Sequence, residues 1–106
     1  MLRGEIWWVN FDPSVGADVK KRRPAIIVSN NTANSYLNRV QVIPLTSNVS
    51  KLYPCEVLVD FNGVKSKAMA DQLTTVSKLR VVNRAGEITH YEIKNIEKAI
   101  KLQLAL

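Results

Sequence analysis

Residues 4–11 read GEIWWVNF, a run of β-branched and aromatic side chains that is typical of a β-strand. Asp12-Pro13 follows it and indicates a turn. Residues 14–21 contain Gly16 and three charged side chains, which predicts a loop. Because Trp7 and Trp8 point to opposite faces of such a strand, we expect one in the core and the other half-exposed or at an interface, and neither in an active site.

Most of the remaining chain also has the pattern of strands. The continuous apolar run at residues 24–29 predicts a buried strand, and residues 32–38 suit one short helical turn. Asn62-Gly63 is a strong hairpin signal. The other predicted strands are residues 39–45, ending or bulging at Pro44, and residues 56–60, 66–76, 79–82 and 86–88.

The C-terminal segment changes to a helical period. Apolar residues recur at intervals of three and four, and Thr89 with Glu92 matches a capping box, so we predict an amphipathic helix from about His90 to Leu104. Many short strands with one terminal helix indicate a mainly β fold, a small barrel or strongly curved sheet with the helix packed against it. At 106 residues, the chain is expected to form a single domain, residues 1–106.

The composition excludes several classes of protein. An apolar fraction of 46% argues against wholesale disorder, and one cysteine with one histidine cannot form a zinc cluster. Cys55 lies in an alternating apolar run, where a buried thiol is favoured over a nucleophile. No apolar stretch approaches the roughly 18 residues of a membrane span, so we expect no membrane contact and a cytoplasmic protein.

The charge indicates a polyanionic partner. Fifteen Lys and Arg residues against nine Asp and Glu give a net charge of +6, and four of the cations form the run Lys20-Lys21-Arg22-Arg23. By itself this run fits a binding surface for nucleic acid and a solvated loop equally well.

Six short motifs, in this order, make the sequence similar to the MazF/PemK family, the toxin halves of bacterial toxin–antitoxin pairs. They are Gly4-Glu5-Ile6-Trp7, Phe11-Asp12-Pro13, Gly16-Ala17-Asp18, Arg23-Pro24, Ile43-Pro44-Leu45-Thr46-Ser47 and Asp71-Gln72-Leu73. The resemblance covers nearly the whole chain. It implies an SH3-like barrel that forms a homodimer, binds an acidic MazE-like antitoxin, and cleaves single-stranded RNA, usually messenger RNA, without a metal or other cofactor.

The resemblance also implies catalytic roles for Arg23 and Thr46. In metal-free cleavage the 2′-hydroxyl of the RNA attacks the adjacent phosphate and leaves a 2′,3′-cyclic phosphate and a 5′-hydroxyl. A guanidinium and a hydroxyl can together stabilise the charge that grows on that phosphate. Arginine is a poor general base because it keeps its proton.

The proton acceptor is open at the level of sequence. Some family members carry a histidine where this chain has Ala17 and an arginine where it has Met69. Asp18 and Asp71 remain as candidates. Asp18 alternatively orders its loop, and we favour a role for Asp71 in bracing Arg23.

RNA binding is expected in the two loops that flank the catalytic pair, with strong salt dependence. Tyr53 suits either base stacking or packing over the barrel end. The residues predicted to bind RNA are Gly16, Asp18, Lys20, Lys21, Arg22, Ser47, Asn48, Tyr53, Asp71 and Gln72.

Two other functions fit the same fold. One is a gyrase poison of the CcdB type, but residues 103–106 lack the terminal Trp-Gly-Ile of those toxins. The other is a non-catalytic RNA-binding barrel, which the absence of counterparts at Ala17 and Met69 leaves open.

Overall fold

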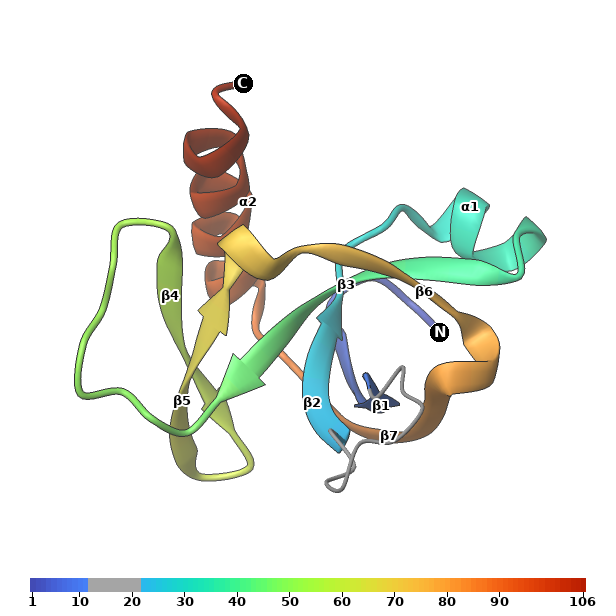
Figure 1. Cartoon of the computed structure of the whole chain (residues 1–106), viewed down its shortest axis with the longest axis horizontal. Coiled ribbons are helices and arrows are strands. Elements are labelled where there is room, and N and C mark those ends of the chain that lie inside the picture. The colour runs from blue at the N-terminus through green and yellow to red at the C-terminus, as the bar shows by residue number, and fades with distance from the viewer. Residues whose placement is uncertain (12–21) are drawn as a thin grey trace, which may run out of the picture.

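The structure, a computed structural model, describes residues 1–11 and 22–106. Figure 1 shows a curled sheet with one long helix standing against it. In chain order the elements are β1 (Glu5–Asn10), β2 (Arg22–Ile27), α1 (Asn31–Tyr36), β3 (Arg39–Thr46), β4 (Glu56–Phe61), β5 (Val64–Met69), η1 (Ala70–Gln72), β6 (Thr74–Ser77), η2 (Lys78–Arg80), β7 (Val81–Glu87) and α2 (His90–Leu104).

The strands form one antiparallel sheet that curls into a half-barrel. Its order is β4-β5-β3-β2-β1-β7, and β6 pairs with β3 outside this path. The prediction of a mainly β fold with a C-terminal helix is therefore confirmed. Within the described part of the chain, no helix is long and apolar enough to cross a membrane.

The single strand predicted at residues 66–76 is wrong. The 3₁₀ turn η1 divides it, and the Leu73 N–H donates to the carbonyl of Ala70 across the turn. The two halves pair with different parts of β3: β5 contacts its end, whereas β6 contacts its beginning. Because of this break, residues 64–77 pair with both ends of β3. An alternating pattern of residue types does not reveal such a break.

The short strands predicted nearest the C-terminus are also wrong in their bounds. Residues 78–80 form the 3₁₀ turn η2, and β7 then runs continuously from Val81 to Glu87, where two separate strands were predicted. The pairing of β7 with β1 contains register irregularities that let this long strand follow the curl of the sheet.

The hairpin and the helices agree with prediction. Asn62 and Gly63 both have positive φ, as the tight turn between β4 and β5 requires. Helix α2 begins with the predicted capping box, in which Thr89 and Glu92 exchange hydrogen bonds. Its residues Ile96 and Ala99 are buried in a core with Ile6, Ile26 and Ile43 of the sheet, so the helix seals one end of the barrel.

Candidate active site

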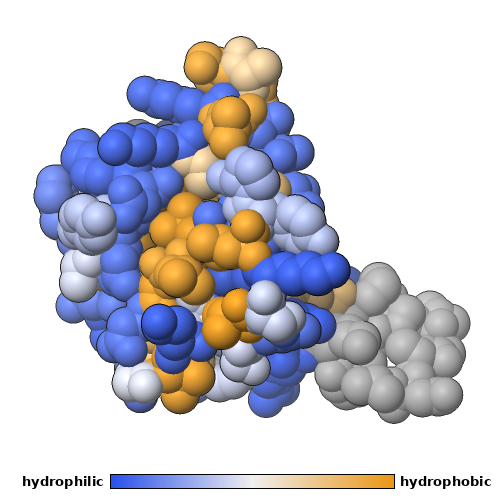
Figure 2. All heavy atoms as spheres, turned by 90° about the vertical axis from the view of Figure 1, so that its left-hand side faces the viewer, coloured by the Kyte–Doolittle hydropathy of each residue, from blue (hydrophilic) through white to orange (hydrophobic). Residues whose placement is uncertain are grey.

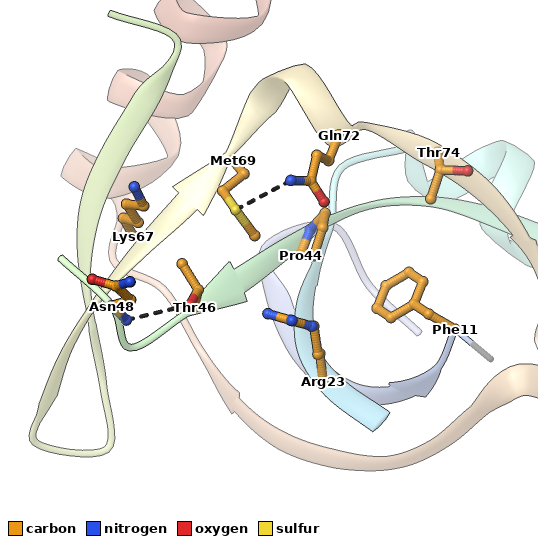
Figure 3. A pocket seen from close by; sticks show the side chains of 9 residues that line it. All are labelled: Phe11, Arg23, Pro44, Thr46, Asn48, Lys67, Met69, Gln72 and Thr74. Carbon is orange, nitrogen blue, oxygen red and sulfur yellow. Dashed lines mark hydrogen bonds between the residues drawn. The ribbon is translucent and has the colours of Figure 1, made fainter. Parts of the chain in front are cut away.

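A hollow of about 550 Å³ opens where β2, β3 and β5 lie side by side. Figure 3 shows Arg23 of β2, Thr46 of β3 and Gln72 of η1 around this hollow. The lining residues are Phe11, Arg23, Pro44, Thr46, Asn48, Lys67, Met69, Gln72 and Thr74. The hollow therefore contains both residues predicted to be catalytic.

Strand register explains why these two residues meet. Ala25 pairs with Pro44 in the β2–β3 ladder. Because numbering runs in opposite directions on antiparallel strands, continuing this register by two residues beyond the last printed pair directs Arg23 toward Thr46, and both line the hollow. Thr46 in turn pairs with Lys67 of β5. One cation, one hydroxyl and a second cation thus form a row across three strands.

The hydroxyl of Thr46 also organises the segment that follows it. Its Oγ1 accepts a hydrogen bond of 3.2 Å from the backbone N–H of Asn48. The Asn48 side-chain oxygen then accepts from the backbone and hydroxyl of Ser50. These local bonds hold the start of residues 47–55 next to the hollow, and the Thr46 hydroxyl keeps its own proton to donate.

A second hollow of about 290 Å³ shares Arg23 and Thr46 with the first. Trp8 lines it, with its ring edge-on to Phe61 at a centroid distance of 6.0 Å. Trp8 thus lies beside the predicted catalytic pair, whereas the sequence led us to expect neither tryptophan in an active site. Strand β1 pairs with β2, and this pairing places Trp8 opposite Pro24, next to Arg23.

Lys67 is a site residue that the sequence analysis missed. It is a lysine with only 8% of its surface exposed, and its Nζ donates to Glu56 Oε1 at 2.9 Å and to the Lys51 carbonyl at 2.8 Å. Burial raises the pKa of the Glu56 carboxyl, but hydrogen bonds from the Tyr53 N–H and from Lys67, with the Lys67 charge, hold the pKa below its usual value. Lys67 occupies an alternate position of residues 64–69, where a lysine is ordinarily expected to be exposed, so the sequence did not indicate its burial.

The turn η1 separates the two residues of the Asp-Gln motif. Gln72 lines the hollow and donates to the Met69 sulfur at 3.5 Å, whereas Asp71 is exposed and is absent from the lining. Successive residues of a 3₁₀ helix point about 120° apart, so both cannot face the hollow. Across residues 1–11 and 22–106 no ion pair joins Asp71 to Arg23, and the predicted brace is not formed.

The other predicted RNA-binding residues fall into two groups. Arg22 begins β2 and is exposed, Ser47 lines the second hollow, and Tyr53 is exposed with its ring 5.7 Å from Lys67 Nζ. Gly16, Asp18, Lys20 and Lys21 lie outside the described residues, as does Ala17.

Cys55 is half-buried where a buried thiol was predicted, because β4 begins one residue later. His90 begins α2, as predicted, and is exposed.

The lining chemistry suits an anion. Arg23 provides a planar fork of N–H donors, and a hydroxyl and two side-chain amides lie around the same space, from Thr46, Asn48 and Gln72. None of the described lining residues is a histidine or a carboxylate. This set can bind a phosphate and stabilise added negative charge, and it offers no ordinary acceptor for a proton.

Comparisons with known proteins agree on one family. Residues 2–104 match the family described as "PemK-like, MazF-like toxin of type II toxin-antitoxin system". "Endoribonuclease MazF9" of Mycobacterium tuberculosis is 36% identical, over 100% of this chain and 98% of its own. "Endoribonuclease toxin MazF" of Escherichia coli is 29% identical, over 93% of this chain and 89% of its own.

A solved structure of similar shape is described as MazE–MazF from Deinococcus radiodurans. It superposes with a TM-score of 0.87 at 25% identity and covers 100% of this chain and 96% of that one. The similarity in sequence and in shape thus extends over the whole chain.

Proposed function

Because the chain belongs to the PemK-like, MazF-like family of toxins of type II toxin–antitoxin systems, we propose that it is an endoribonuclease toxin whose catalytic residues are Arg23 and Thr46. The observation that carries this proposal is the strand register that brings the Arg23 guanidinium and the Thr46 hydroxyl into one hollow. The substrate is single-stranded RNA, since a paired strand would not leave its bases free to enter hollows beside the phosphate.

The reaction is transesterification within the RNA. The 2′-oxygen forms a bond to phosphorus, the bond to the 5′-oxygen breaks, and the ends are a 2′,3′-cyclic phosphate and a 5′-hydroxyl. The 2′-hydroxyl loses a proton and the departing 5′-oxygen gains one. Arg23 binds the phosphate oxygens bidentately and Thr46 donates a further hydrogen bond, so both offset the charge that develops in the transition state.

The two hollows give the RNA its path. Arg23 and Thr46 line both of them, so a phosphate held by this pair has space for a nucleoside on either side. Asn48 and Gln72 present amides that can bond base edges on one side, and Trp8 offers an aromatic surface on the other. Specificity for a short sequence then resides in the walls of the hollows, not in the catalytic pair.

We extend the proposal to partners and location. An acidic antitoxin would be attracted to the same cationic surface as RNA, in line with a net charge of +6. A second copy of the chain suits the apolar side chains gathered on the face shown in Figure 2. Exposed apolar residues of β4, β5 and the segment before β4 are Leu58, Val64 and Leu52. RNA cleavage places the protein in the cytoplasm, where it acts as the single domain 1–106.

The test is incubation of the full chain with a long single-stranded RNA in EDTA, followed by mapping of the cut positions and of the end chemistry. Discrete cuts with cyclic-phosphate and 5′-hydroxyl ends are expected. RNA that stays intact while expression still stops growth would overturn the proposal in favour of a gyrase poison. RNA that is bound and left intact, without toxicity, would point to a binding barrel.

A further inference from the structure

The segment that follows Thr46 is tied to the sheet through one buried ion pair. Lys67 Nζ and Glu56 Oε1 lie 2.9 Å apart, with side chains only 11% and 7% exposed. Each partner also binds the backbone of this segment: Lys67 donates to the Lys51 carbonyl, and Glu56 accepts from the Tyr53 N–H at 2.8 Å. The pair therefore fixes two points of residues 51–56.

The same lysine borders the site, with its ammonium group directed at Glu56 and at the Lys51 carbonyl. It lines the hollow that contains Arg23 and Thr46, and it pairs with Thr46 across the β3–β5 ladder. The ring of Tyr53 lies 5.7 Å from its Nζ, within the range of a cation–π interaction. One ammonium group thus contacts the segment at Lys51, at Tyr53 and, through Glu56, at the Tyr53 backbone.

Stability alone does not account for such a pair. Removing two charges from water costs several kcal/mol, and apolar residues of similar volume often stabilise a protein as well or better. This pair lies beside the hollow and is bonded to one loop. A role in positioning that loop therefore explains the pair better.

We propose that Lys67 and Glu56 are positioning residues that hold residues 51–56 as a wall of the RNA groove, with Tyr53 as its stacking surface. The inference rests on the proposed function, because the groove is that of the ribonuclease. The pair acts on binding and sequence choice, whereas Arg23 and Thr46 act on the reacting phosphate. Loss of the pair therefore weakens RNA binding more than it slows cleavage of bound RNA.

The experiment replaces both charges at once. The double variant Lys67→Met/Glu56→Leu removes the pair without leaving one charge buried alone. The single variant Glu56→Gln keeps an acceptor for the Tyr53 N–H and serves if the double variant does not fold. Lys65→Met, on the same strand but exposed, is the control for loss of one positive charge.

Four quantities are measured on the full chain: the urea midpoint, the amide exchange of residues 51–56, the Kd for a 2′-deoxy analogue of an RNA that carries a cut site of the wild type, and the kcat for that RNA. In the double variant we expect an unchanged or higher midpoint, faster exchange of these amides, a Kd raised about tenfold, as for one lost stacked base, and a kcat within about threefold. Lys65→Met should leave the exchange unchanged and raise the Kd much less.

Unchanged exchange, or faster exchange with an unchanged Kd, would overturn the positioning role. A wild type that neither cuts nor binds RNA would instead refute the proposed function. Amide exchange would then still decide whether the pair fixes the segment, so the two failures remain distinguishable.

Discussion

Arg23 is exposed at the start of β2, so its side chain contributes to the site and little to the core. Arg23→Ala should abolish RNA cleavage, because in the proposed mechanism the guanidinium is the main group that offsets the phosphate charge. The urea midpoint should stay near that of the wild type.

Arg39→Ala is the matched control for Arg23→Ala, since Arg39 is an exposed arginine at the start of β3, where that strand pairs with β6. It should retain nearly full activity. Cleavage by Arg23→Ala at the wild-type rate would contradict the catalytic assignment.

Thr46 differs from Arg23 in supplying one hydrogen bond and no charge. Thr46→Val keeps the shape of the side chain and should lower kcat by about tenfold to a thousandfold, as the loss of one positioned donor does. Thr75→Val, an exposed threonine of β6, controls for the lost hydroxyl. An unchanged rate in single-turnover assays would reduce Thr46 to an anchor for the Asn48 N–H.

At the scale of elements, Gly4 lies against the Ile93 side chain of α2. Its φ is +92°, and a Cβ there would lie 2.8 Å from Cδ1 of Ile93 in the helix. Gly4→Ala should therefore destabilise the fold by both the positive φ and the contact, about 2–4 kcal/mol in urea unfolding.

Gly63 separates these two causes. Its φ is +87°, but a Cβ there would meet nothing within 4 Å. Gly63→Ala should cost only about 1–2 kcal/mol, the conformational part. Equal losses of stability in the two variants would show that the contact with Ile93 is relieved without cost.

For the whole molecule, stability is linked to pH through three carboxylates among residues 1–11 and 22–106. Burial raises the pKa of Glu5, Glu56 and Glu97, but hydrogen bonds and neighbouring cations outweigh it and hold each pKa below the ordinary 4.5. Because the unfolded chain then binds protons more readily, this stabilisation is complete above the ordinary pKa and is lost as the pH falls through the lowered folded values.

The urea midpoint should accordingly be flat between about pH 7 and 5.5 and fall below about pH 4.5. Glu56→Gln removes one of the three groups and should reduce the size of that fall. A midpoint that rises on acidification, or a fall of full size in the variant, would contradict the linkage.

Local chemistry in the sequence was enough for several parts of the molecule. The capping box, the Asn62-Gly63 turn and the apolar stripe of α2 act within a few residues, so their outcome could be predicted from the chain. The motifs around Arg23 and Thr46 likewise predicted one site for both residues, and both line the same hollow.

Tertiary structure decided what depends on partners far apart in the chain. Residues 64–77 pair with both ends of β3 and are divided into two strands by η1. At this turn Asp71 is exposed, whereas Gln72 lines the hollow. Strand pairing also makes Lys67 a buried neighbour of Thr46 and brings Trp8 beside Arg23. Side-chain burial and contact depend on which strands become neighbours, and a local pattern of residues does not specify that pairing.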